Sequence, residues 1–120
     1  MSGDKCIFCN EQIMSKQRIK QFTDWFVINN NKPLAIGHLL VISRKHIRSL
    51  AEIDVLMWKS YREALHWAIV YIKKNHHKNP FTFINAPEGQ SVFHFHHHLV
   101  PNYFGPNEFD EKLRSPSSET

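Results

Sequence analysis

The segment that decides the fold is Phe93-His94-Phe95-His96-His97-His98-Leu99-Val100, in which histidine recurs at every second position. Side chains of a β-strand point alternately to its two faces. His94, His96 and His98 are therefore predicted to share one face, with Cα atoms roughly 6.6 Å apart along the strand. The opposite face is predicted to carry Phe95, His97 and Leu99. The bulky apolar residues favour a core strand, which we expect over Ser91–Pro101.

Three imidazoles on one strand face have three interpretations. In the first interpretation they form a solvated polar face, although the neighbouring phenylalanines argue for a buried strand. Alternatively, they bind a catalytic metal ion through a His-x-His pattern that leaves one position open for water. In the third interpretation one imidazole attacks a substrate while its neighbours orient it and bind charge.

The third interpretation makes demands that this sequence can meet. Imidazole is a good nucleophile near neutral pH because its unperturbed pKa is about 6.5. One ring nitrogen must be unprotonated, and the other must donate its proton to a hydrogen bond that fixes the tautomer, for which a strand offers backbone carbonyls. Phosphorus is the natural electrophile, because imidazolium and amide groups can hold phosphoryl oxygens. The preceding stretch supplies such polar groups in Asn85, Gln90 and Ser91.

The rest of the chain predicts a sheet covered by one long helix. Apolar residues recur at helical spacing from about Ile53 to Lys74, with Asp54 as the expected N-cap. Bulky or alternating stretches predict further strands at Gln17–Phe22, Trp25–Asn30, Gly37–Ser43 and Phe81–Asn85. The order of strands, one helix and strands again predicts an α+β domain with a mostly antiparallel sheet.

Length and composition limit the class of protein. The chain has 120 residues, of which 42% are hydrophobic and 22% charged, as in an ordinary folded domain. We expect one domain over residues 1–103 and a partly disordered tail over 104–120, which is rich in Pro, Ser and acidic residues. The longest apolar run, Trp67–Ile72, is far shorter than the roughly 18–20 residues of a membrane span. With no secretory signal at Met1–Cys6, we expect a cytoplasmic protein with no membrane partner.

Charge and cysteine content leave more than one partner open. The net charge is +4, and a mild positive field suits an anionic small substrate or a nucleic acid about equally. Because no basic run of five or more occurs, nucleic acid is not the first expectation. The two cysteines form a Cys6-x-x-Cys9 pair. This pair is a redox pair, for which the expected βαβ context is missing, or two buried thiols, or half of a zinc site.

Three segments together resemble one known family. The histidine segment with the preceding Gly89-Gln90-Ser91-Val92 resembles the His-φ-His-φ-His-φ-φ signature of the histidine triad (HIT) superfamily. Cys6-Ile7-Phe8-Cys9 resembles its N-terminal Cys-x-x-Cys, and residues 30–46 resemble its Pro…Gly-His-x-Leu-Val-Ile-Pro-Lys-x-His block. The chain departs from the pattern at Ser43, where Pro is usual, and at His97, where an apolar residue is usual. For His97 we predict a buried neutral histidine with one hydrogen bond rather than a fourth functional imidazole.

The resemblance implies a HIT-like fold and a nucleotidyl hydrolase or transferase. Such enzymes cleave at the α-phosphate of nucleoside phosphoramidates or dinucleoside polyphosphates through a nucleotidyl-histidine intermediate. Carried over, His96 would be the nucleophile, His98 would contact the phosphate near the leaving group, and His38 would join them. Substrate contacts would come from Asn30 on the ribose hydroxyls and, around the phosphates, from Asn85, Gln90 and Ser91. The implied ligand is a nucleotide, with adenine as the family default, and the implied assembly is a homodimer.

The resemblance also implies one structural zinc ion per chain. Its ligands would be Cys6, Cys9, His46 and His94, a closed set that would pin the N-terminal segment beside the histidine strand. A different class of function remains open beside the enzyme. In that alternative the chain is a zinc-stabilised nucleotide-binding or interaction module that retains the histidines but turns over little substrate.

Overall fold

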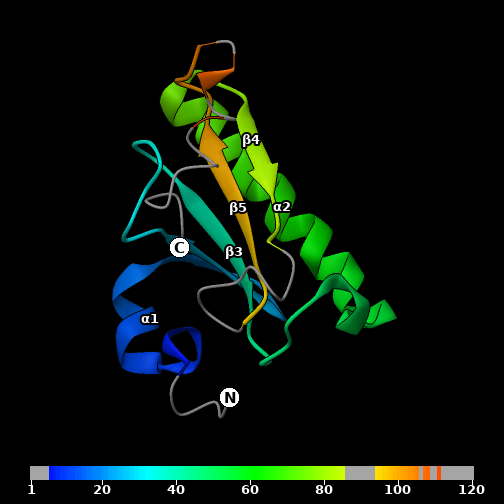
Figure 1. The fold of residues 1–120 in the computed structure, drawn as a ribbon. Helices are drawn as coiled ribbons and strands as arrows, with labels where there is room; N and C mark the ends of the chain where they lie inside the picture. Colours follow the sequence, from blue (N-terminus) through cyan, green and yellow to red (C-terminus); the bar gives the residue numbers. More distant parts are fainter. Residues whose placement is uncertain (1–5, 86–93, 106, 109–110, 112–120) are drawn as a thin grey trace.

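The computed structural model describes residues 6–85, 94–105, 107, 108 and 111. One antiparallel sheet has the strand order β1-β2-β3-β5-β4. The long helix α2 covers one face of the sheet, and the short helix α1 lies on the other side (Figure 1). The elements are α1 (Glu11–Gln17), β1 (Arg18–Gln21), β2 (Trp25–Asn29), β3 (Leu39–Ser43), α2 (Val55–His76), β4 (Pro80–Phe83) and β5 (His96–Pro101). The predicted α+β fold with one long helix is confirmed.

Helix α2 forms where its apolar periodicity places it. The Asp54 side chain accepts a hydrogen bond from the Met57 N–H, so the predicted N-cap is confirmed. The helix ends at His77, whose φ of 55° is left-handed. Five residues at helical spacing are buried against the sheet, namely Met57, Tyr61, Ala64, Ala68 and Ile72. No helix of the described ranges is long and apolar enough to cross a membrane.

The register of β5 against β3 determines which side chains lie on each face of the sheet. His96 lies opposite Ile42 and His98 opposite Leu40, whereas His97 lies opposite Val41. Residues paired in this way point to the same face. Ile42 and Leu40 belong to the apolar layer on the side of α1, and Val41 belongs to the core beneath α2. The predicted alternation of residues 95–99 is therefore confirmed, with His96 and His98 on the face away from α2.

Some local structure differs from the sequence prediction. Helix α1 was not predicted, because seven residues are too few for a clear apolar period. Its available signal was Asn10, whose side chain accepts hydrogen bonds from Gln12 N–H and Ile13 N–H. His94 precedes strand β5 instead of lying within it. The expected start of that strand at Ser91 and the predicted disorder of the tail beyond residue 111 fall outside the described residues.

Candidate functional site

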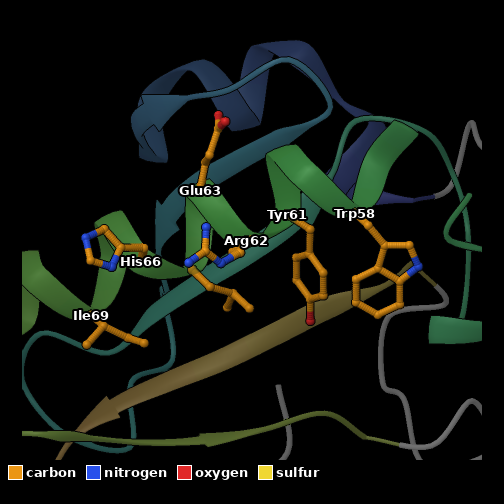
Figure 2. A pocket seen from close by; sticks show the side chains of 7 residues that line it. Trp58, Tyr61, Arg62, Glu63, His66 and Ile69 are labelled. Carbon is orange, nitrogen blue, oxygen red and sulfur yellow. The ribbon is translucent and has the colours of Figure 1, made fainter. Parts of the chain in front are cut away.

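A hollow of about 600 Å³ lies against α2, on the opposite side of the sheet from His96 and His98. Figure 2 shows Tyr61 pointing from this helix toward β5. The hollow is lined by Trp58, Tyr61, Arg62, Glu63, Leu65, His66 and Ile69. None of the histidines predicted to be catalytic is among these residues, so the hollow is separate from the histidine cluster.

His96 is held as a neutral imidazole with one free nitrogen. Its Nδ1–H donates a hydrogen bond of 2.7 Å to the backbone carbonyl of His94. Its Nε2 is buried and has no hydrogen-bond partner among the described residues. Burial lowers the pKa of His96, although the bond to the carbonyl acts in the opposite direction. The proton is thus fixed on Nδ1, and Nε2 carries the lone pair that a nucleophile requires.

A chain of hydrogen bonds sets the opposite tautomer in His98. The Leu34 N–H donates to His38 Nδ1 at 3.0 Å, so the proton of neutral His38 lies on Nε2. His38 Nε2–H then donates to His98 Nδ1, also at 3.0 Å. The proton of His98 is left on Nε2, which is buried and has no acceptor among the described residues.

His38 and His98 are both kept uncharged by their surroundings. Burial, followed by the proximity of His96, lowers the pKa of His38 to about 4. Burial and the neighbouring histidines lower the pKa of His98 to about 2. The rings of His96 and His98 lie side by side, with centroids 4.9 Å apart. One ring therefore offers a lone pair, and its neighbour offers an N–H donor, which is the pair of groups needed to attack an electrophile and to hold its oxygen atoms.

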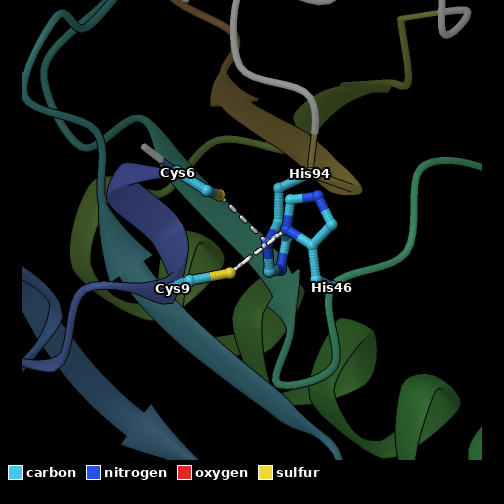
Figure 3. Close-up of side chains that lie close together, drawn as sticks. All are labelled: Cys6, Cys9, His46 and His94. Carbon is cyan, nitrogen blue, oxygen red and sulfur yellow. Dashed lines mark hydrogen bonds between the residues drawn. The ribbon is translucent and has the colours of Figure 1, made fainter. Parts of the chain in front are cut away.

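A second cluster joins three distant parts of the chain. Cys6 and Cys9 come from the turn before α1, His46 follows β3, and His94 precedes β5 (Figure 3). His94 Nδ1 lies 3.3 Å from Cys6 Sγ and 3.4 Å from Cys9 Sγ. His46 Nδ1 lies 3.1 Å from Cys9 Sγ and 3.2 Å from His94 Nδ1. All four atoms lie within 4.8 Å of one another, so the structure brings the predicted metal ligands together.

The protonation of this cluster suits a cation. His94 Nε2–H donates a hydrogen bond of 2.7 Å to the Ser43 carbonyl, which leaves the lone pair of Nδ1 facing the two sulfur atoms. Partial desolvation and the adjacent Cys6 thiol raise the pKa of Cys9 to about 11, although the residue is exposed. A bound cation would offset this rise, because it attracts both thiolates. Two thiolates and two neutral imidazoles are the donor set of tetrahedral structural metal sites. The cluster can therefore hold a metal ion.

His94 links the two clusters. Its imidazole faces the two cysteines, and its backbone carbonyl accepts a hydrogen bond from His96 Nδ1–H. A change in the position of His94 would therefore alter the hydrogen bond that fixes the tautomer of His96.

Comparison with known proteins identifies the family. A family model for the HIT domain matches residues 11–105. The chain belongs to the HIT family. Membership places it in a superfamily of nucleotide-binding hydrolases and transferases.

Individual relatives agree with this assignment. The HIT protein is 30% identical over 109 residues to an uncharacterised HIT-like protein of Saccharolobus solfataricus, covering 82% of this chain and 74% of that protein. It resembles the crystal structure of a HIT family member from Bacillus subtilis with a TM-score of 0.74 and 26% identity, covering 95% of this chain and 89% of the other. A zinc-bound histidine triad family protein from Mycobacterium smegmatis has a TM-score of 0.66 and 24% identity, covering 94% and 91%. The last likeness shows the fold alone.

His97 faces α2 in this HIT protein. Its Nδ1 lies 2.6 Å from the hydroxyl oxygen of Tyr61. Burial raises the pKa of Tyr61, so its hydroxyl stays protonated and donates a hydrogen bond to the imidazole. Burial also lowers the pKa of His97 to about 4. The predicted single hydrogen bond of a neutral imidazole is present, but the ring is half-buried and not buried as predicted.

The predicted substrate-binding residues are only partly described in the HIT structure. Asn30 is buried, and its backbone N–H donates to the carbonyl of His38 at 3.0 Å. Its Oδ1 accepts a hydrogen bond from the Lys32 N–H. Asn85 follows β4 and is half-buried. Gln90 and Ser91 lie outside the described residues, so the substrate contacts of all four remain predictions.

A glycine and an aromatic ring contribute to the site in ways that were not predicted. Gly37, with a φ of 85°, turns the chain into His38, and a Cβ there would overlap the His76 imidazole. Phe83 stacks on His98 with ring centroids 4.2 Å apart. Phe83 lies opposite His98 only because β4 pairs with β5, which no local pattern in the sequence reveals.

Proposed function

We propose that this HIT protein is a nucleotidyl hydrolase or transferase that acts at the α-phosphate of nucleoside phosphoramidates or dinucleoside polyphosphates. The observation that carries the proposal is the state of His96, a buried neutral imidazole whose Nδ1–H is held by a carbonyl and whose Nε2 is unpartnered among the described residues. His98 supports it by offering an N–H beside that lone pair.

The proposed reaction has two displacements at phosphorus. In the first, His96 Nε2 forms a bond to the α-phosphorus, and the bond from phosphorus to the leaving amine or phosphate breaks. The leaving atom takes up a proton from solvent, while His98 Nε2–H donates a hydrogen bond to a phosphoryl oxygen. The substituted His96 ring is positively charged, and its Nδ1–H remains bonded to the His94 carbonyl. In the second displacement water attacks phosphorus and releases a proton to solvent, and the phosphorus–nitrogen bond breaks to restore the neutral His96 imidazole.

The nucleotide is expected to be held by groups around these histidines. We assign Asn30 to the ribose hydroxyls and Asn85, Gln90 and Ser91 to phosphate or leaving-group oxygens. Adenine is the base expected from the family. A cytoplasmic location is also part of this proposal, because thiols remain reduced there.

A substrate panel tests the proposal. Adenosine phosphoramidates and diadenosine polyphosphates are incubated with the parent protein, and adenosine monophosphate is measured as the product. Rapid quenching followed by intact-mass spectrometry is expected to find the chain heavier by one nucleotidyl group on His96. Nucleotide binding with neither product nor adduct would contradict the enzyme and support a binding module instead.

We further propose that the cluster of Cys6, Cys9, His46 and His94 binds one structural zinc ion. Ligand atoms about 2.0–2.3 Å from a tetrahedral zinc ion lie roughly 3.3–3.8 Å from one another, close to the separations observed here. The zinc-bound relative from Mycobacterium smegmatis supports this choice of metal. A closed set of four protein ligands supplies a cross-link and leaves no position for substrate. His96 lies outside the cluster, which argues against a catalytic metal centre built from the three histidines.

A homodimer is the third part of the proposal. Strand β4 ends the sheet, so one of its edges has no partner strand in the described part of the chain. The hollow against α2 is lined by Trp58, Tyr61 and Arg62, residue types that are enriched at protein–protein interfaces. Trp58 is 48% exposed in the single chain. We propose that a second copy covers this hollow.

The Trp58→Glu substitution is expected to shift the protein from dimer to monomer, because it places a charge in the proposed interface. Light scattering coupled to size exclusion should give twice 14.2 kDa for the parent and 14.2 kDa for the variant. Val55→Glu is the matched control, since Val55 lies on the same helix, is 84% exposed and does not line the hollow. A monomeric parent would rule out the dimer.

A further inference from the structure

The plane of the His98 ring depends on side chains alone. Within the described ranges, His98 has a single side-chain hydrogen bond, which it accepts at Nδ1 from His38 Nε2. His96, by contrast, is bonded to a backbone carbonyl. One hydrogen bond at one corner of a ring leaves the ring free to tilt about that corner, because rotation about its terminal torsion is broad. A second contact is needed to fix the direction of Nε2–H.

Phe83 provides that second contact. Its ring and the His98 ring are parallel within 7°, with centroids 4.2 Å apart. The two residues lie directly opposite each other in the β4–β5 register. Directly opposite side chains of antiparallel strands have Cβ atoms about 4.5–5.5 Å apart, so their contact is fixed by the backbone pairing. The face of His98 is therefore held by β4, and its edge is held by His38.

The chemistry of the stack also matches the role proposed for His98. The face of an aromatic ring carries partial negative charge, and it favours a neighbouring ring that becomes more positive. Imidazole becomes more positive when its N–H bonds an anionic phosphoryl oxygen. Contact with Phe83 thus orients His98 and favours the polarisation that it undergoes when it binds phosphate.

We infer that Phe83 is a positioning residue, which sets the ring plane of His98 and thereby the direction of its Nε2–H. The consequence for turnover rests on the proposed function. The effect on the ring itself does not, because it exists in the protein without substrate.

Three substitutions separate this role from general packing. Phe83→Leu removes the aromatic face but keeps an apolar side chain, whereas Phe83→Tyr keeps the aromatic face. Phe81→Leu is the matched control, because Phe81 lies two residues earlier on β4 in the same apolar cluster and opposite Val100 instead of His98. Thermal unfolding of all three variants checks that the cost in packing is similar for the two leucine substitutions.

Imidazole NMR spectra of the unliganded protein give the first result. Because protons above an aromatic face are shielded, the ring protons of His98 are expected upfield of those of an unstacked histidine. Phe83→Leu is expected to remove this shielding, while Phe83→Tyr and Phe81→Leu retain it. Unchanged His98 resonances in Phe83→Leu would overturn the inference.

Steady-state kinetics give the second result. Phe83→Leu is expected to lower kcat about two- to tenfold, the size of one aromatic pair, with KM largely unchanged. Phe83→Tyr should restore most of kcat. An equal loss in Phe81→Leu would show that packing alone is responsible and would overturn the inference. If the parent turns over no nucleotide while the spectra behave as expected, the proposed function is wrong and the placement of His98 by Phe83 is supported.

Discussion

Replacement of His96 by asparagine is expected to lower turnover of nucleoside phosphoramidates on the order of 10⁴-fold or more, because the variant has no atom that can form the covalent intermediate. The asparagine amide can still donate a hydrogen bond toward the His94 carbonyl, which accepts from His96 Nδ1–H in the parent. The measurement is product formation under saturating substrate, together with calorimetric titration of a nucleotide. Nucleotide affinity should change little, since the other binding groups remain.

The size of this effect follows from the divided roles of the two neighbouring rings. His96 offers the only lone pair of the two Nε2 atoms, because the hydrogen bond that His98 accepts from His38 forces its proton onto Nε2. Loss of an N–H donor weakens the stabilisation of phosphoryl oxygens and costs roughly 10²–10³-fold. Loss of the attacking atom removes the proposed pathway altogether. His98 variants should therefore retain more activity than His96 variants.

His97→Asn is the matched control for this experiment. It makes the same substitution at the adjacent histidine of the same strand, on the face that contacts Tyr61. Turnover should remain within a few fold of the parent, although loss of the Tyr61 hydrogen bond is expected to lower stability by about 1 kcal/mol. Parent-like turnover in His96→Asn, or an equal loss in His97→Asn, would exclude His96 as the nucleophile.

The sequence predicts the histidine arrangement well because strand alternation is a local property. His96 and His98 share a face whatever partner strands they have, and the buried residues on both sides exclude a solvated strand. The same holds for α2, whose apolar stripe and N-cap lie within one continuous segment. Local patterns therefore predicted the fold class and the shared histidine face, whereas His96 was chosen as the candidate nucleophile through the family resemblance.

The remaining features depend on contacts between distant segments. The tautomer of His98 is set by the Leu34 N–H through His38, and the plane of its ring by Phe83 on another strand. Neither contact can be predicted from the spacing of residues in the sequence, because that spacing does not reveal that β4 pairs with β5. The ligands of the Cys/His cluster were named only through family resemblance. Their convergence on His94 required the pairing of β3 with β5.

Removal of the proposed zinc ion is expected to destabilise the protein by at least about 3 kcal/mol, because a metal that binds only the folded state adds its binding free energy to folding. For a chain of this size that loss lowers Tm by about 10 °C or more. Metal analysis of protein purified without added zinc or chelator should find one zinc ion per chain. A chelator should then lower Tm, and added zinc should restore it.

Cys9→Ser makes this prediction specific. Cys9 is exposed, so exchange of its thiol for a hydroxyl, which can still hydrogen-bond to His46, would change stability by no more than about 0.5 kcal/mol if no metal were bound. A fall in Tm as large as that caused by the chelator, with no further fall when the chelator is added to the variant, would identify the thiol as a metal ligand. Absence of zinc from the parent, or a variant as stable as the parent, would leave the two cysteines as ordinary thiols.

Loss of zinc is also expected to affect His96, the proposed nucleophile, because His94 belongs to both clusters. Without a metal, the His94 imidazole loses coordination at Nδ1 and is held by hydrogen bonds alone, from Nε2 to Ser43 and between Nδ1 and the cysteine sulfur atoms. The carbonyl of the same residue fixes the proton of His96 on Nδ1, so a less ordered His94 would weaken the tautomer that leaves Nε2 free. The expected result is a lower kcat with a smaller change in KM, and a shift of the His96 ring nitrogen resonances in the metal-free protein. If the metal-free protein keeps the kcat and the His96 resonances of the parent, the cross-link stabilises the fold without organising the proposed catalytic histidine.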